Sequence, residues 1–120
     1  MAEVEFIEHN GVRILRIEFV GDLTNDRGRE IMDEAKKIIA SQPQESVRTL
    51  TILGEFHFDT QTATAFREYI EHNKPYIKAG AVIGVAGLRK ALYNSLMFLT
   101  RRDVRICNSE EEAEEYLAGA

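Results

Sequence analysis

The chain has 120 residues, of which 44% are hydrophobic and 29% charged, and its formal net charge is −5 at pH 7. This length fits one domain spanning residues 1–120, and the composition is that of a globular protein rather than a disordered or fibrous one. No apolar run approaches the ~20 residues that a membrane-spanning helix needs, so we expect a soluble protein without a transmembrane segment. A single cysteine, Cys107, excludes an intrachain disulfide and a cysteine-rich metal site.

Two further features of the sequence bear on the cellular location and the binding partners of the protein. The first residues, MAEVEFIEHNG, lack the basic region and the apolar core of a secretory signal, so we expect a cytoplasmic protein. Residues 74–105 carry a net charge of +6, whereas residues 1–73 carry −6 and residues 106–120 carry −5. Such a block is a candidate contact surface for an anion or an acidic partner, or else a set of charges scattered over a solvated face. The net negative charge of the whole chain argues against nucleic-acid binding.

The chain begins with a predicted β-hairpin over residues 4–20. Asn10-Gly11 is the pair favoured in two-residue turns, because both central residues need a positive φ. In the second strand Leu15, Ile17 and Phe19 alternate with charged residues, which predicts one face on a core. Ile14 has the opposite parity, so we expect either a β-bulge or burial on both faces near it.

A helix follows, which Asn25 or Asp26 can cap, and its apolar residues repeat at helical spacing up to Ile39. Residues 47–53 form the next strand. A second helix begins near Thr60, a candidate N-cap, and ends at Asn73–Pro75, because proline cannot donate the continuing hydrogen bond.

Residues 79–85 are a short apolar run typical of a strand buried on both faces. Gly87 opens a third helix, residues 104–107 form the last strand, and Ser109 with Glu112 forms a capping box for a C-terminal helix. Strands that alternate with single helices predict an α/β fold. We expect a five-stranded mixed, mostly parallel sheet with an antiparallel N-terminal hairpin and four helices.

The segment HNKPYIKAGAVIGVAGLRKALYN, residues 72–94, and the final SEEEAEEYL are similar to the STAS superfamily. The chain most resembles its small SpoIIAA-like, Sec14-related (CRAL-TRIO-related) members from bacteria and archaea, and the resemblance covers almost the whole chain. It implies the SpoIIAA-like fold and a regulatory or lipid-binding domain without enzymatic activity.

Resemblance to the anti-sigma-factor antagonists implies a phosphorylation switch at the start of the second helix. A phosphate suits that position because free N–H groups and the helix dipole favour an anion. Aligning Asp59-Thr60 with the family's Asp-Ser pair places Gln61, which cannot be phosphorylated, at the position of the phosphoserine. Thr60 and Thr62 are the candidate phosphorylation sites that remain, and helix capping is the alternative for Thr60.

Resemblance to Sec14-type carriers implies a lipid or another amphiphilic anion as ligand. On a helical wheel, Tyr93 and Met97 lie opposite the core side of the third helix, among basic residues that include Arg89 and Lys90. Apolar residues surrounded by cationic ones are suited to an anionic lipid or an acidic partner helix. The alternatives are packing under a neighbouring element or a second subunit, and a protein-interaction module or homodimer that uses the same surface.

The turn before this helix, Gly84-Val85-Ala86-Gly87, would let its backbone approach a phosphate or headgroup, or else allow tight packing. Our candidate ligand-binding residues are Gly84, Gly87, Arg89, Lys90, Tyr93 and Met97. His57 and Asp59 could form an acid–base pair, but no nucleophile accompanies them in a known motif. We therefore expect no enzymatic activity, no cofactor and no metal site.

Overall fold

The computed structural model describes residues 3–20, 24–54, 59–84 and 104–120. Its elements are the strands β1 (Val4–His9), β2 (Val12–Phe19), β3 (Val47–Leu53), β4 (Ile77–Ile83) and β5 (Val104–Ile106), the helices α1 (Asn25–Ala40), α2 (Thr60–Asn73) and α4 (Glu110–Ala118), and the 3₁₀ turn η1 (Lys74–Tyr76). The third helix that the sequence predicts lies outside the described residues. Within them, three of the four expected α-helices are present.

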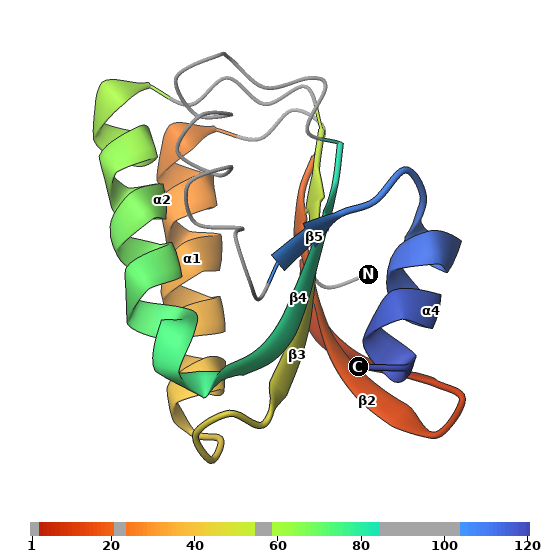
Figure 1. Cartoon of the computed structure of the whole chain (residues 1–120). Helices are drawn as coiled ribbons and strands as arrows, with labels where there is room; N and C mark the ends of the chain where they lie inside the picture. The colour runs from red at the N-terminus through yellow and green to blue at the C-terminus, as the bar shows by residue number, and fades with distance from the viewer. Residues whose placement is uncertain (1–2, 21–23, 55–58, 85–103) are drawn as a thin grey trace.

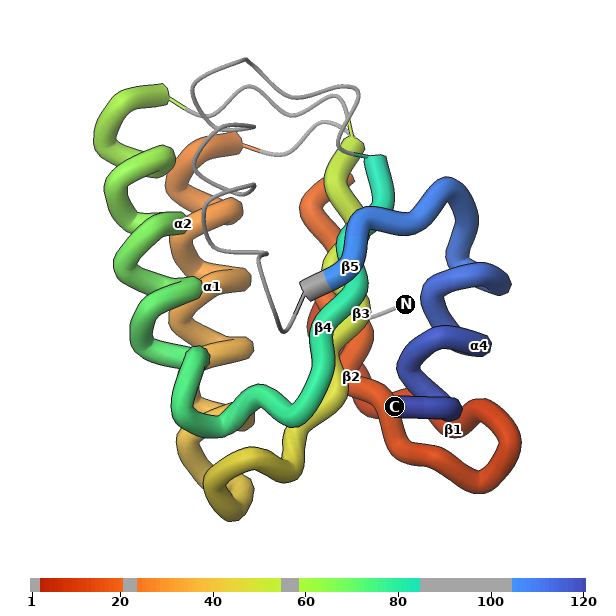
Figure 2. Tube along the Cα trace, viewed as in Figure 1, coloured from red at the N-terminus to blue at the C-terminus, as the bar shows by residue number. Residues whose placement is uncertain are grey.

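The five strands form one mixed sheet in the order β1-β2-β3-β4-β5. β1 and β2 are antiparallel, and each later strand is parallel to the one before it. The predicted α/β class and the antiparallel hairpin at the edge of the sheet are thereby confirmed. α1 and α2 cover one face of the sheet and α4 covers the other, which gives three layers (Figures 1 and 2).

The hairpin turn forms as its sequence predicts, with φ of 51° at Asn10 and 77° at Gly11. β1 and β2 pair without a bulge, and Ile14 and Leu15 are both completely buried although they point to opposite faces. Burial on both faces is therefore the explanation for the opposite parity of Ile14.

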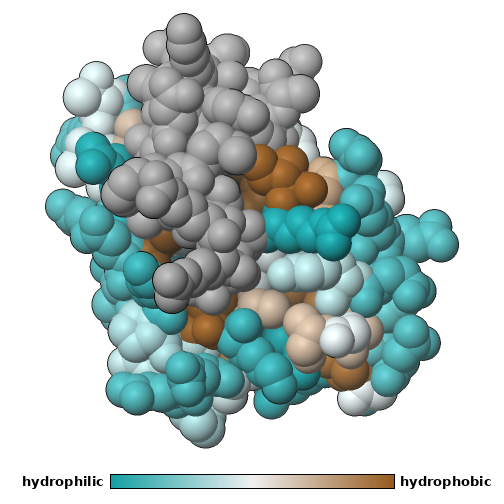
Figure 3. Space-filling view, in the orientation of Figure 1, coloured by the Kyte–Doolittle hydropathy of each residue, from teal (hydrophilic) through white to brown (hydrophobic). Residues whose placement is uncertain are grey.

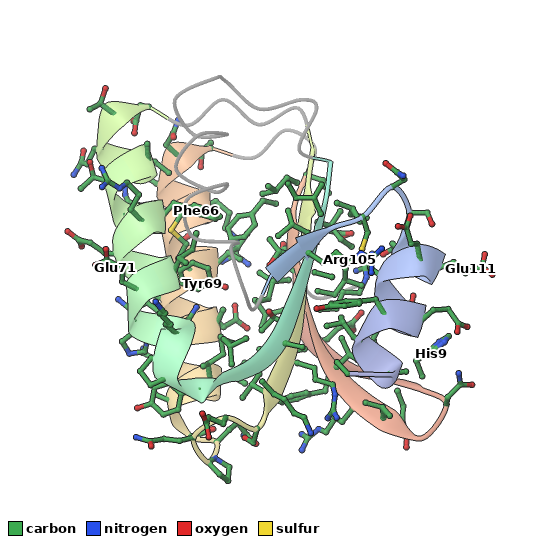
Figure 4. All side chains as sticks on the ribbon, in the orientation of Figure 1. His9, Phe66, Tyr69, Glu71, Arg105 and Glu111 are labelled. Carbon is green, nitrogen blue, oxygen red and sulfur yellow. The ribbon has the colours of Figure 1, made fainter. Side chains whose placement is uncertain are left out.

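The sheet separates two apolar clusters. The helical-pair cluster, between the sheet and α1 and α2, contains Leu15, Ile17, Phe19, Ile31, Met32, Ala35, Ile39, Phe66, Tyr69 and Val82, among others. The α4 cluster, on the other face, contains Ile14, Leu50, Ile52, Ala79, Ala81, Cys107, Ala113 and Leu117. Phe66 and Tyr69 point from α2 toward the sheet (Figure 4). β4 is thus buried on both faces, as its apolar run predicts.

Two predicted helix caps are wrong by one or two residues. Thr24 caps α1 and accepts a hydrogen bond from the backbone of Arg27, and Asp59, rather than Thr60, caps α2. The cap must have an extended backbone and a side-chain oxygen that reaches the first turn, and Thr24 and Asp59 meet both conditions.

The N-terminus of α4 forms nearly as predicted. The Ser109 hydroxyl accepts from the Glu112 N–H at 3.1 Å. The Glu112 carboxylate accepts from the backbone of Asn108, also at 3.1 Å, one residue earlier than in a standard capping box.

Candidate functional site

The candidate site is the edge of the sheet where the parallel strands end. β2, β3 and β4 all finish there, and α1 and α2 both begin there (Figure 1). In open α/β sheets this edge is where ligands usually bind, because the loops and the helix N-termini converge on it.

Two glycines shape the described part of this edge. Gly84 ends β4 with a φ of +85°, and a Cβ atom there would lie 1.7 Å from the carbonyl oxygen of Leu53. Gly54, after β3, donates its N–H to Phe19 at 2.9 Å, and a Cβ on it would press on Val20 at 3.0 Å. The backbones of neighbouring strands therefore approach here more closely than a side chain allows.

Polar side chains join the N-termini of α1 and α2. The Asn25 side-chain oxygen accepts from the backbone N–H of Asp59 at 2.9 Å. Arg29 binds Asp26 on its own helix, donates to the Thr62 hydroxyl at 2.6 Å, and lies 3.9 Å from the Asp59 carboxylate. The two helices are thus fixed together at the end where they face the site.

The charge of this group is close to balanced but slightly negative. Hydrogen bonds from the hydroxyl and the backbone N–H of Thr62 lower the pKa of Asp59, and Arg29 adds to the shift. Asp26 and Asp59 thus supply two carboxylates against one guanidinium. This group of residues therefore offers an anionic ligand no excess of positive charge.

The structure places three of the predicted site residues at this edge. Gly84 lies at the end of β4, Thr60 is exposed at the first position of α2, and Thr62 is fully buried against Arg29. Of the two candidate phosphorylation sites, Thr60 is the accessible one.

The other predicted residues lie outside the described part of the chain: Gly87, Arg89, Lys90, Tyr93, Met97 and His57. Asp59, the proposed partner of His57, serves as the cap of α2. Sequence reasoning missed Arg29 and Asn25 as contacts between the helices. A polar side chain near the start of a helix usually indicates an exposed position, and a partner 30 or more residues away leaves no local pattern.

The one cysteine of the chain has a structural role. Cys107 is buried in the α4 cluster, where burial raises the pKa of its thiol, so it packs as a small apolar residue. Among the described residues, no three His, Cys, Asp or Glu side chains gather to hold a metal ion. No helix within that part of the chain is both long and apolar enough to cross a membrane.

No protein-family model, curated protein or solved structure matches the chain. The likeness to the STAS superfamily therefore remains a prediction from residues 72–94, and functional inference depends on the edge described above.

Proposed function

We propose that the protein is a non-enzymatic, STAS-like binding or regulatory domain that takes up an amphiphilic anion, such as a lipid, at the carboxyl edge of the sheet. The supporting observation is where β4 ends. Gly84 brings the chain to this edge beside the N-termini of α1 and α2, and the next residues, 85–103, combine four basic side chains with a long apolar sequence.

The described polar groups at this edge contact one another, and this favours binding over catalysis. Arg29 and Asp59 are occupied in holding α1 to α2, and Thr62 is buried between them. A catalytic acid, base or nucleophile must instead reach the substrate. In our proposal these groups provide a rigid base, and Arg89 and Lys90 attract the anionic headgroup while Tyr93 and Met97 contact its apolar part.

The test is co-sedimentation with vesicles. Wild-type protein should sediment with vesicles that contain phosphatidylglycerol and remain in solution with pure phosphatidylcholine. The double variant Arg89→Glu/Lys90→Glu should lose this binding. The matched control is Lys36→Glu/Lys37→Glu, which reverses an adjacent basic pair on α1 and should bind as the wild type does.

Native mass spectrometry of protein purified from its own host is the second arm. A bound amphiphile should add mass under gentle conditions and disappear under denaturing ones. Bare polypeptide in this spectrum, combined with no sedimentation on anionic vesicles, would overturn the proposal.

A protein partner, or a second copy of the chain, at Tyr93 and Met97 is the second candidate. The exposure of Thr60 at the N-terminus of α2 favours it, because a phosphate there could control binding at the same edge. Light scattering on the same samples separates the two candidates. A contact with a second copy predicts that Tyr93→Glu lowers the measured mass, and a contact with another protein predicts that Tyr93→Glu abolishes capture of that protein from the host. A lipid site leaves both unchanged.

A further inference from the structure

The opposite edge of the sheet carries a hollow of about 490 Å³, lined by Glu45, Lys74, Pro75, Ile77 and Lys78. This volume lies within the range of small-molecule sites. The connections from α1 to β3 and from α2 to β4 meet there, at the end of the sheet farthest from Gly84 (Figure 1). The hollow is therefore separate from the site at the carboxyl edge.

Three irregularities of the backbone build this hollow. Glu45 has a φ of 55°, which is unusual for a residue other than glycine. Lys78 is an extra residue in β4, because Val47 pairs with Ile77 and Arg48 pairs with Ala79. Such a bulge turns a side chain away from its regular direction. Pro75 lies in η1, and its carbonyl oxygen accepts from the Glu45 N–H at 3.0 Å.

The charges around the hollow are of both signs and are not paired with one another. Within the described part of the chain, neither Lys74 nor Lys78 forms an ion pair, and neither does Glu45. The positive φ lies at Glu45 and the bulge at Lys78, so both irregularities fall on charged residues of the hollow, while Pro75 and Ile77 supply apolar surface.

We propose that this hollow binds a small zwitterion of the amino-acid type. The carboxylate of the ligand pairs with Lys74 and Lys78, its ammonium group pairs with Glu45, and its apolar part lies on Pro75 and Ile77. A simple anion would satisfy the lysines and leave Glu45 repelling it. A ligand with both charges completes every pair, and this site does not depend on the function proposed for the carboxyl edge.

The test is an NMR titration of the ¹⁵N-labelled protein with three matched probes: free leucine, N-acetylleucine and leucinamide. Free leucine carries both charges, and each of the others lacks one. Free leucine should shift the amide signals of residues 45–46 and 74–78 in a saturable way. N-acetylleucine should bind up to about fivefold more weakly, because it loses one exposed ion pair, and leucinamide should be weakened at least as much, because it loses the pairs with both lysines.

Variants of the lining residues test which side chain contacts the ammonium group of the ligand and which contacts its carboxylate. Glu45→Gln should remove the preference for leucine over N-acetylleucine, and the double variant Lys74→Gln/Lys78→Gln should remove the preference for leucine over leucinamide. Lys37→Gln on α1 is the control and should change neither. Equal binding of all three probes to the wild type, or no saturable shift at residues 45–46 and 74–78, would overturn the proposal.

Discussion

Gly84 is the residue whose replacement should damage the fold most directly. In Gly84→Ala the new methyl group would have to occupy space 1.7 Å from the Leu53 carbonyl oxygen, on a backbone with a φ of +85°. We expect a loss of about 2–4 kcal/mol in the free energy of unfolding, since both the overlap and the strained φ act against the native state. Urea denaturation followed by circular dichroism measures it.

Gly119→Ala is the matched control for this substitution. Gly119 has a negative φ of −90°, and a Cβ there would lie at an ordinary 3.6 Å from the Glu115 carbonyl oxygen. Its unfolding free energy should stay within about 0.5 kcal/mol of the wild-type value. A Gly84→Ala protein as stable as the control would show that the ends of β3 and β4 can separate at little cost.

At the residue scale the sequence predicts turn chemistry well and distant partners badly. Asn10-Gly11 predicts its own turn, because the positive φ values are a property of those two residue types. Glu45 adopts a similar φ without any such signal, since its hydrogen bond to Pro75 imposes the conformation from 30 positions away. Arg29 is a comparable case, because Thr62 and Asp59 reach it only after the helices have packed.

At the scale of the elements, α4 is held to the sheet by two buried apolar residues and by ion pairs. Ala113 and Leu117 are fully buried. Arg16 on β2 binds Glu110 at 2.6 Å. His9 on β1, which lies beside α4 in Figure 4, is 3.3 Å from Glu114 and 3.1 Å from Glu115. Burial alone would lower the pKa of Arg16, but hydrogen bonds to Glu110 and Glu18 raise it, so the guanidinium stays charged. Nine residues are too few for a stable isolated helix, so α4 depends on these contacts.

We expect Glu110→Gln to lower the free energy of unfolding by up to about 1 kcal/mol, because it removes the charge that pairs with the half-buried Arg16 while Glu110 itself is partly exposed. Glu111→Gln in the same first turn removes an equal charge that forms no ion pair within the described part of the chain, and it should have little effect. Urea denaturation at low and high salt measures both. Equal losses in the two variants would mean that the helix dipole, rather than the pair with Arg16, determines the effect.

On the scale of the whole molecule, the two apolar clusters should behave independently. Phe66→Leu and Leu117→Ala lie on opposite faces of the sheet, so their losses of unfolding free energy should add to within about 0.5 kcal/mol. Phe19 and Phe66 touch edge to face, with ring centroids 5.9 Å apart, so Phe19→Leu combined with Phe66→Leu should deviate from additivity by more than that. Thermal and urea denaturation of the single and double variants measure the coupling.

The same measurements can contradict the prediction of independent clusters. Strong coupling between Phe66→Leu and Leu117→Ala would show that the two clusters act as one core. On the face shown in Figure 3, hydrophilic residues make up most of the coloured surface, with smaller apolar patches between them. Among the described residues, Val20 is the one large hydrophobic residue that is exposed.

The fold was predictable because its signals are local and repeat along the chain. Alternation in β2, helical spacing in α1 and the apolar run of β4 each specify an element, and single helices between strands specify parallel pairing. Of the candidate site, the sequence indicated Gly84 and the start of α2, and the structure places both at one edge of the sheet. The contacts of the site were not predictable, because Asn25 and Asp59 meet across 34 positions through side chains that could equally have faced water.

The order of the strands has a consequence for how the chain is made. Every neighbouring pair in the sheet is also consecutive in the sequence, so each strand that leaves the ribosome finds its partner already synthesised. The hairpin can form first, and β3, β4 and β5 can then add to the growing edge in turn. Because α4 follows all five strands in the sequence, one face of the nascent sheet keeps its apolar residues uncovered until α4 has been translated, and that interval is when these residues most need protection from aggregation.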